Sequence, residues 1–315
     1  MPQNEYYSGG GEKTVAKTVI LDKYLWAYLS IMEKHWGGEK WYVDTHAGTG
    51  FTNEMGVNIP GSTLRALNHN FDRYYFYEKD PDHFDTLVET LEQETGESFH
   101  IGTIGNRDDR SAFCEDPRIS VANMDCNEGV KFLTRNSGSS SHWFTFVDPE
   151  KFSVERELME SLRRRGNMDI LFNFQTTAFF RNAGENAEHS HDKVATNLGD
   201  HFPIDGTPDD YVNFYKEDVF ENFGWKSKSR KMISEGSNEW RYDLIFASQN
   251  ETAVGIMDDI FDSDLKNDVT EEINDWRDSS EIDQSGLNTF IKIDSHGEDQ
   301  NNTPDDDEQS CLGDF

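Results

Sequence analysis

The feature that most constrains this chain is an alternation of short apolar runs with longer segments of helical period. The apolar runs lie at residues 40–44, 74–78, 119–125, 143–148 and 168–174. Helical segments separate them, at residues 61–67, 83–93, after residue 125 and at 155–165. Strands that are apolar on both faces are typical of parallel sheets covered by helices on both sides. The sequence therefore predicts an α/β fold with a doubly wound, mostly parallel sheet.

Elements on either side of this alternation complete the predicted sheet. Residues 14–36 place apolar side chains at helical spacing, which predicts a helix that packs on the sheet. Further on, a helix at 209–220 precedes two predicted strands, 230–233 and 242–248, with a turn between them. These two strands are expected to form a hairpin that closes the sheet with an antiparallel edge strand. Helices are expected at 251–261 and 269–276.

Changes in composition suggest how the chain is divided. The expected parts are a flexible N-terminus at 1–13, a main domain at 14–262 with polar insertions at about 94–118 and 175–206, a C-terminal extension at 263–293 and an acidic disordered tail at 294–315.

Acidic residues greatly outnumber basic ones. The chain has 61 Asp and Glu against 29 Lys and Arg, a formal net charge of −32 and a pI near 4.5. The acids are spread along the whole sequence, which suggests a surface adapted to a salt-rich cytoplasm, as in a halophilic archaeon, where screening removes the self-repulsion. Aromatic residues at 13% argue against an acidic disordered protein.

Several classes of site and location are disfavoured. The first residues lack the basic start and apolar block of a secretory signal, and no apolar stretch approaches the length of a bilayer span, so a cytoplasmic protein is expected. Cys114, Cys126 and Cys311 have no metal or redox spacing. His189 and His191 lack a nearby third ligand, so no metal site is predicted.

Polar residues follow the ends of the predicted parallel strands, where ligands bind in open α/β sheets. They are Asp44 with the turn at Gly48 and Gly50, Glu78, Asp125, and Asp148 with Pro149. The turn departs from the Gly-x-Gly-x-x-Gly pattern and has no phosphate-binding lysine, which disfavours a nicotinamide-dependent oxidoreductase. A phosphate-poor ligand such as S-adenosylmethionine is favoured instead.

In the order and spacing of these motifs, the chain resembles the class I methyltransferases and, more closely, the three-Cys-motif partner (TcmP) family. The resemblance covers roughly residues 14–260. It rests on the stretches 23–29, 44–50, 61–63, 77–81, Asp125 with Glu128, 146–149, 171–174 and 243–247.

The resemblance implies a Rossmann-like class I methyltransferase fold with a seven-stranded sheet and S-adenosylmethionine as cofactor. Asp44, Ala47, Gly48 and Gly50 would line the methionine end of the cofactor. Glu78 would accept hydrogen bonds from the ribose hydroxyls, and Asp125 would bind the adenine amino group. In this interpretation the Gly48 turn is the centre of a cofactor pocket.

Asp148 and Pro149 correspond to the start of the Asp-Pro-Pro-Tyr motif of amino-methyltransferases, which holds an exocyclic amine. Glu150 and Lys151 replace the second proline and the aromatic residue, so either Phe152 stacks on the base or no residue does. The resemblance thus implies methyl transfer to an amine of nucleic acid. Short basic stretches at 163–165 and 226–231 favour that acceptor, whereas the acidic surface opposes it. The alternative is a non-catalytic, S-adenosylmethionine-binding partner subunit of a three-Cys-motif protein.

Overall fold

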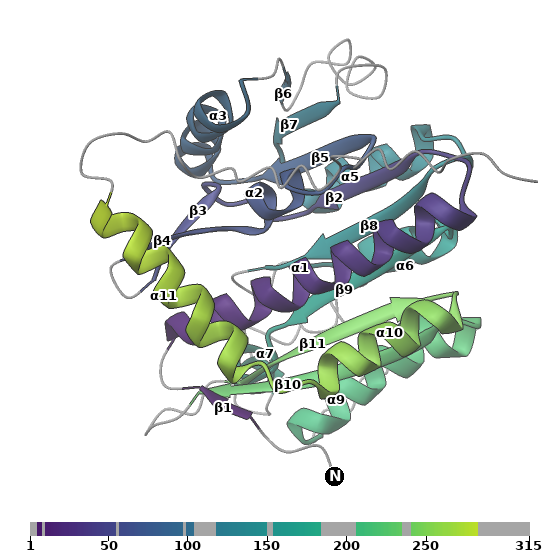
Figure 1. The fold of residues 1–315 in the computed structure, drawn as a ribbon. Helices are drawn as coiled ribbons and strands as arrows, with labels where there is room; N and C mark the ends of the chain where they lie inside the picture. The colour runs from purple at the N-terminus through teal and green to yellow at the C-terminus, as the bar shows by residue number, and fades with distance from the viewer. Residues whose placement is uncertain are drawn as a thin grey trace, which may run out of the picture.

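One mixed sheet with helices on both faces forms the body of the protein (Figure 1). The computed structural model describes residues 5–7, 10–54, 57–96, 99–103, 118–149, 154–183, 206–234 and 241–282. The acidic tail, most of the 175–206 insertion and the histidine pair lie outside the described residues.

The sheet has nine strands in the order β1-β10-β11-β9-β8-β2-β5-β7-β6. Their bounds are β1 (Glu5–Tyr7), β2 (Lys40–Asp44), β5 (Arg73–Glu78), β6 (His100–Thr103), β7 (Ile119–Asn123), β8 (His142–Val147), β9 (Met168–Phe174), β10 (Lys226–Ser234) and β11 (Arg241–Ser248). All neighbouring strands are parallel except at β11, which is antiparallel to both β9 and β10.

The predicted mostly parallel α/β sheet with one antiparallel strand is confirmed. The antiparallel strand is β11, which lies between β9 and β10, so that β10 and the short β1 form the outer edge on this side. On the other edge, β6 extends the sheet within the stretch expected to be irregular. β1 and β6 escaped the sequence analysis because strands of 3 and 4 residues are too short to show a periodic pattern.

Helices cover both faces of the sheet. The face towards the viewer in Figure 1 carries α1 (Gly10–His35), α2 (Ser62–Leu67), α3 (Pro81–Thr95), α10 (Glu251–Asp262) and α11 (Lys266–Ile282). The opposite face carries α5 (Cys126–Asn136), α6 (Arg156–Arg165), α7 (Thr176–Ala183) and α9 (Pro208–Tyr215). The predicted helices at 14–36, 83–93, 155–165 and 251–261 correspond to α1, α3, α6 and α10.

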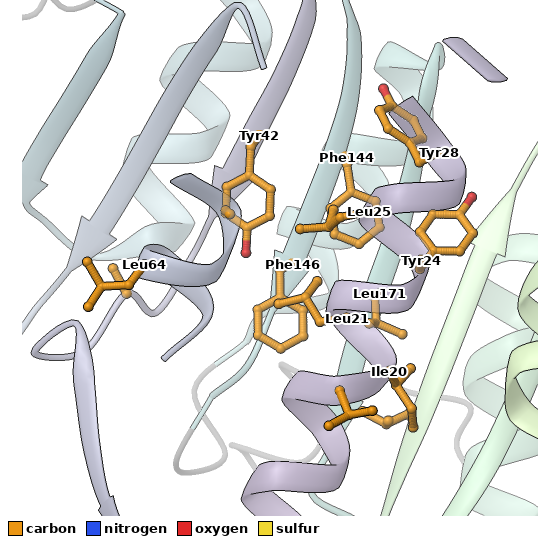
Figure 2. Packing of buried hydrophobic residues seen from close by; sticks show 14 of the residues in the cluster. Ile20, Leu21, Tyr24, Leu25, Tyr28, Tyr42, Leu64, Phe144, Phe146 and Leu171 are labelled. Carbon is orange, nitrogen blue, oxygen red and sulfur yellow. The ribbon is translucent and has the colours of Figure 1, made fainter. Parts of the chain in front are cut away.

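The two hydrophobic cores follow the alternation of side chains along each strand. In β2, Tyr42 belongs to the core beneath α1, whereas Trp41 and Val43 belong to the core on the other face. Tyr24 of α1 packs on Phe144 of β8 with ring centroids 5.5 Å apart (Figure 2). Each fully buried side chain of this size stabilises the fold by about 1.5–3 kcal/mol. α1 is therefore fixed firmly on the sheet.

A small hairpin that the sequence analysis missed lies between the glycine turn and α2. It consists of β3 (Phe51–Glu54) and β4 (Val57–Pro60), which pair with each other and not with the main sheet. The side chain of Arg65 in α2 holds it from one side, with Nε donating to the Pro60 carbonyl at 3.0 Å. The same guanidinium forms an ion pair with Glu272 of α11 at 2.5 Å.

The helix expected as part of a C-terminal extension belongs to the core. Leu265, Val269 and Ile273 are buried in the same cluster as the α1 side chains. α11 also packs against α1 and β4. The described part of the chain contains no helix both long and apolar enough to cross a membrane.

The excess of acidic residues predicts that the stability of the protein depends on salt concentration. Self-repulsion of a net charge of −32 weakens as the screening length falls from about 10 Å at 0.1 M salt to about 3 Å at 1 M. We therefore expect the melting temperature to rise by at least several degrees between 0.1 M and 2 M KCl, measured by scanning calorimetry. An equal rise in sucrose, which does not screen charge, or no rise in KCl would contradict this explanation.

Candidate active site

A cleft of about 750 Å³ opens at the carboxyl ends of the central strands. β2 lies here between β5 and β8, so the chain winds outward in opposite directions from this point, and such a switch in strand order creates a crevice in open sheets. The lining residues are Thr14, Lys17, Thr18, residues 46–52, Gly61, Ser62, residues 78–81, His83, Asp148, Pro149, Asn173 and Gln175. Of the eight site residues predicted from sequence, six line it: Ala47, Gly48, Gly50, Glu78, Asp148 and Pro149.

The glycine turn that follows β2 is held on several sides. Gly48 and Gly50 have positive φ angles of 63° and 88°. Residues that carry a Cβ atom rarely adopt this conformation, whereas glycine does so readily. The amide of Ala47 donates to the Tyr77 carbonyl at 2.9 Å, and the Gly50 carbonyl accepts from the amide of Gly61 at 2.8 Å. The turn is thus tied to β5 and to the N-cap of α2, and it lines the cleft.

Glu78 stands at the end of β5, as predicted, and is only 9% exposed. Its Oε2 accepts from the Gly48 amide at 2.9 Å, and its Oε1 accepts from the Asp80 amide at 2.8 Å. Each carboxylate oxygen retains a further lone pair that can accept from a ligand hydroxyl. Glu78 therefore positions the glycine turn and presents acceptors to the cleft.

Asp44 lies one layer behind the cleft and is fully buried. Its carboxylate accepts from the His46 amide at 3.1 Å and from the Tyr42 hydroxyl at 3.3 Å, and it also bonds with Ser62. Burial, and to a lesser extent the negative charge of Asp148, raise the pKa of Asp44 from 3.8 to about 7, although these hydrogen bonds act to lower it. Near neutral pH this acid is therefore poised between its two charge states.

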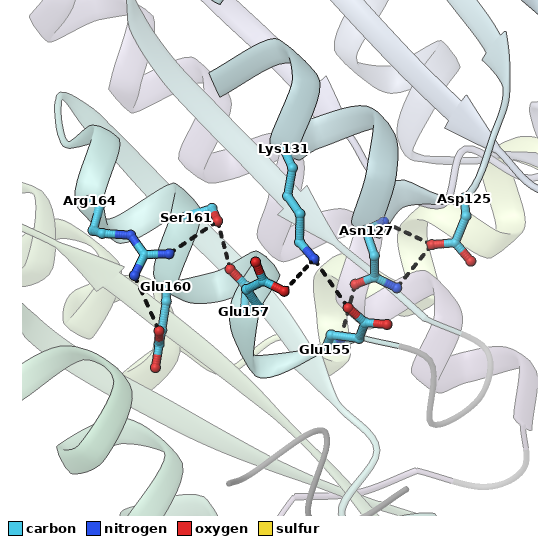
Figure 3. A network of polar contacts seen from close by, with 8 residues as sticks. All are labelled: Asp125, Asn127, Lys131, Glu155, Glu157, Glu160, Ser161 and Arg164. Carbon is cyan, nitrogen blue, oxygen red and sulfur yellow. Dashed lines mark hydrogen bonds and ion pairs between the residues drawn. The ribbon is translucent and has the colours of Figure 1, made fainter. Parts of the chain in front are cut away.

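Asp125 is outside the group of lining residues. It caps the N-terminus of α5, where its Oδ1 accepts from the backbone amide and the side-chain amide of Asn127, both at 2.9 Å. Asn127 in turn accepts from the Glu155 amide at the start of α6 (Figure 3). The other oxygen of Asp125 pairs with Lys79, which does line the cleft, at 2.7 Å. The structure therefore brings Asp125 near the site through Lys79 and gives its carboxylate a capping role.

Asp148 and Pro149 form the other end of the cleft and are already engaged by donors of the chain. Lys17 of α1 pairs with Asp148 Oδ2. Asn173, at the end of β9, donates to Asp148 Oδ1 at 2.6 Å, and Gln175 donates to the Pro149 carbonyl at 3.0 Å. The Oδ1 of Asn173 is buried without a hydrogen-bond partner among the described residues, which leaves a free acceptor beside Asp148.

His46 lines the cleft as a neutral side chain. Burial lowers the pKa of His46 to about 4, and its ring contacts Thr45 Oγ1 at 2.8 Å and Cys126 Sγ at 3.7 Å. Burial also raises the pKa of the Cys126 thiol. Neither group therefore adds charge to the cleft at neutral pH.

Lys17, Asn173 and Gln175 also line the cleft but were not predicted from the sequence. Asn173 could have been found, because it ends a predicted strand as the other candidates do. Lys17 gave no signal, since its partner lies 131 positions away in the sequence. The candidates Glu150, Lys151 and Phe152 lie outside the described residues. Among the described residues no group of three or more potential ligands is placed to bind a metal.

Comparisons with known proteins return only distant structural similarity. No protein-family model matches the chain, and no curated protein matches it either. The structure is similar to protein LPL1258 from Legionella pneumophila, with 11% identity over 79% of this chain and 91% of that one and a TM-score of 0.44. It is also similar to a putative RNA methyltransferase, PH1948 from Pyrococcus horikoshii, with 12% identity, coverage of 72% and 83% and a TM-score of 0.36.

A third similar structure is the plantazolicin methyltransferase BamL in complex with a triazolic desmethylPZN analog and SAH. The identity is 6%, the coverage is 85% of this chain and 79% of that one, and the TM-score is 0.39. At such low identities and scores, what these proteins bind and modify does not transfer to this chain.

Proposed function

We propose that this chain binds S-adenosylmethionine in the cleft between the glycine turn and Asp148 and transfers its methyl group to an amine. The observation that carries the proposal is the arrangement of the cleft at the strand-order switch. A backbone turn without a phosphate-binding lysine lies at one end, and two oxygen acceptors, Asp148 and the Pro149 carbonyl, lie at the other.

The lining residues fit the parts of this cofactor. The turn at Ala47, Gly48 and Gly50 offers bare backbone for the methionine group, and the carboxylate of Glu78 offers acceptors for ribose hydroxyls. Asp44 adds a negative charge behind the turn once it ionises, which favours the cationic ammonium and sulfonium. Asp125 binds Lys79 and the start of α5, so its proposed contact with the adenine amino group rests on the family resemblance alone.

The Asp148 end of the cleft can hold and orient an amine. When bound, S-adenosylmethionine supplies an electrophilic methyl group whose bond to sulfur breaks as the amine nitrogen attacks, with the bonding electrons passing to sulfur. Asp148 and the Pro149 carbonyl would accept hydrogen bonds from the two N–H groups of the amine and so direct its lone pair towards the methyl group. The proton that the methylated nitrogen then loses would pass to Asp148 or to water.

For the acceptor we retain an exocyclic amine of nucleic acid, which is the class that the family resemblance implies. The exposed basic residues Arg164, at 59% side-chain exposure, and Lys226, at 56%, lie near the amino ends of β9 and β10, at the end of the sheet opposite the cleft, and do not support contact with phosphate at the cleft. The net charge of −32 opposes it, so such binding would need concentrated salt to screen the acidic surface.

A titration tests the cofactor assignment. Calorimetry in 2 M KCl should show that S-adenosylmethionine binds and that NADH does not. Glu78→Ala should weaken binding about tenfold or more, the loss expected for charge-assisted hydrogen bonds. Glu89→Ala, on the exposed face of α3, is the matched control and should bind as the wild type does. Binding of NADH without binding of S-adenosylmethionine would favour an oxidoreductase instead.

One observation favours the second candidate, a non-catalytic partner subunit of a three-Cys-motif protein that binds the cofactor without transferring its methyl group. The acceptors that would hold the amine are occupied by Lys17, Asn173 and Gln175 of the same chain. If these donors stay in place when the cofactor binds, they compete with an amine for Asp148 and for the Pro149 carbonyl. Cofactor binding with no methyl transfer to oligonucleotides would favour this candidate.

A further inference from the structure

Lys17 occupies the position at which the proposed acceptor amine would bind. Its ammonium contacts Asp148 Oδ2, and the two side chains are only 13% and 18% exposed. Asn173 donates to the other carboxylate oxygen at 2.6 Å. Each oxygen of Asp148 therefore holds a donor of the protein itself. Lys17 also lines the cleft, so its ammonium stands where an amine from the cleft would approach Asp148, and the amine must displace it.

Lys17 is the donor that can leave. Asn173 is 3% exposed and belongs to β9, where its backbone pairs with Leu244 of β11. Its side chain has little freedom to turn away. Lys17 carries its ammonium on a flexible four-carbon stem, so rotation of the side chain can move the charge while α1 stays fixed on the sheet.

Separation of this ion pair needs another anion to receive Lys17. A charge that is largely removed from water is strongly destabilised when its partner is taken away. Among the residues that the structure describes, two lysines line the cleft, and the other, Lys79, is 72% exposed and pairs with Asp125. His46 is neutral because burial lowers its pKa to about 4. An anionic group that enters the interior of the cleft therefore finds Lys17 as its cation.

We propose that Lys17 is a positioning residue that exchanges Asp148 for the carboxylate of the cofactor's methionine group, and so frees Asp148 for the acceptor amine. This inference rests on the proposed function. It makes the two binding events cooperative, because the cofactor removes the lysine that blocks the acceptor. By linkage, an amine at Asp148 favours the cofactor by the same factor.

Two product-like ligands separate this role from a structural one. S-adenosylhomocysteine carries the carboxylate, whereas 5′-methylthioadenosine lacks the whole amino-acid group. By calorimetry, Lys17→Met should weaken S-adenosylhomocysteine about 10- to 100-fold, as expected for the loss of a charge-assisted hydrogen bond. Binding of 5′-methylthioadenosine should change by less than about twofold, because it makes no contact with the lysine in this proposal. Lys17→Arg should restore most of the lost affinity.

Lys23→Met is the matched control. It makes the same substitution in the same helix, but Lys23 pairs with Asp268 and does not line the cleft. It should leave the affinities for both ligands unchanged. If Lys17→Met does not fold, as judged by circular dichroism, Lys17→Gln serves for the same measurement. The proposal is overturned if the affinity for S-adenosylhomocysteine is unchanged, or if both ligands weaken equally.

The exchange also predicts an effect of Asp148 on cofactor affinity. Asp148→Asn removes the competitor for Lys17, so it should strengthen S-adenosylhomocysteine binding several-fold without affecting 5′-methylthioadenosine. Weaker binding of S-adenosylhomocysteine to this variant would contradict the exchange. If the wild type binds neither ligand, the proposed function itself fails, whereas binding of both with unaltered ratios in every variant contradicts only the role of Lys17.

Discussion

Asp44→Asn should make the protein more stable at pH 8 and at the same time weaken its binding of S-adenosylmethionine. The pKa of Asp44 is raised by burial from 3.8 to about 7. Between these values the folded state holds a proton that the unfolded state has released, so stability falls as the pH rises and the full penalty is present above pH 7. A neutral asparagine avoids that penalty.

The expected gain in the free energy of unfolding at pH 8 is on the order of 2–4 kcal/mol, the energy of a shift of this size less some loss of hydrogen bonds. Near pH 4, where Asp44 is protonated when folded, the variant should have no advantage. Chemical denaturation at both pH values measures the difference. Affinity of the wild type for S-adenosylmethionine should rise as the pH passes through 7, and this dependence should be missing from the variant.

Asp169→Asn separates the effect on stability from the effect on cofactor affinity. Asp169 is also fully buried, with its pKa raised to about 6, and it accepts from Tyr24 at 2.8 Å, outside the cleft. Its asparagine variant should likewise change the pH dependence of stability but leave the affinity for S-adenosylmethionine unaltered. If Asp44→Asn destabilises the protein equally at pH 4 and pH 8, Asp44 is a purely structural acceptor.

Gly50→Ala should destabilise the glycine turn for two reasons that can be measured separately. The φ angle of +88° is unfavourable for alanine, and the added methyl group would lie 2.9 Å from Thr90 Cγ2. We expect a loss of about 2–4 kcal/mol in the free energy of unfolding, the sum of backbone strain and overpacking. Affinity for S-adenosylmethionine should fall with it, because the turn lines the cleft.

Two further variants separate the loss of stability in Gly50→Ala into the part due to backbone strain and the part due to the contact with Thr90. Gly48→Ala carries the backbone strain alone, since φ is +63° and no atom lies within 4 Å of the new methyl group, so it should lose only about 1–2 kcal/mol. Thr90→Ser added to Gly50→Ala removes the clashing methyl group but keeps the hydroxyl that donates to the Thr49 carbonyl. The double variant should recover the steric part of the loss. Equal losses for Gly48→Ala and Gly50→Ala would show that the contact with Thr90 does not matter.

The sequence was most informative where strands are buried on both faces. Such strands appear as continuous apolar runs, and the bounds of β2, β5, β8 and β9 agree with the predicted runs to within one residue. The expectation that ligands bind at the carboxyl ends of parallel strands likewise identified Glu78 and Asp148, which line the cleft. The β3–β4 hairpin was missed, because its polar residues and short strands resemble an ordinary loop.

The position of an acid at a strand end was less informative about its structural role. Asp44, Asp125 and Asp148 all lie at the carboxyl ends of strands, yet one is buried behind the turn, one caps a helix and one faces the cleft. The position in the sequence is equivalent, and the difference comes from the packing of later segments. The pairing of Asp148 with Lys17 depends on where α1 crosses the sheet, which no local pattern encodes.

The cleft is built by segments from both ends of the described chain. α1 supplies Lys17 to one wall of the cleft, and α11 packs on β4 and pairs Glu272 with Arg65, which holds the hairpin that follows the turn. Contacts of such long sequence separation form late in folding, because the chain entropy they cost is regained only when both partners are present. During synthesis, therefore, a nascent chain can complete the sheet before Glu272 has emerged, and the cleft acquires its final shape only afterwards.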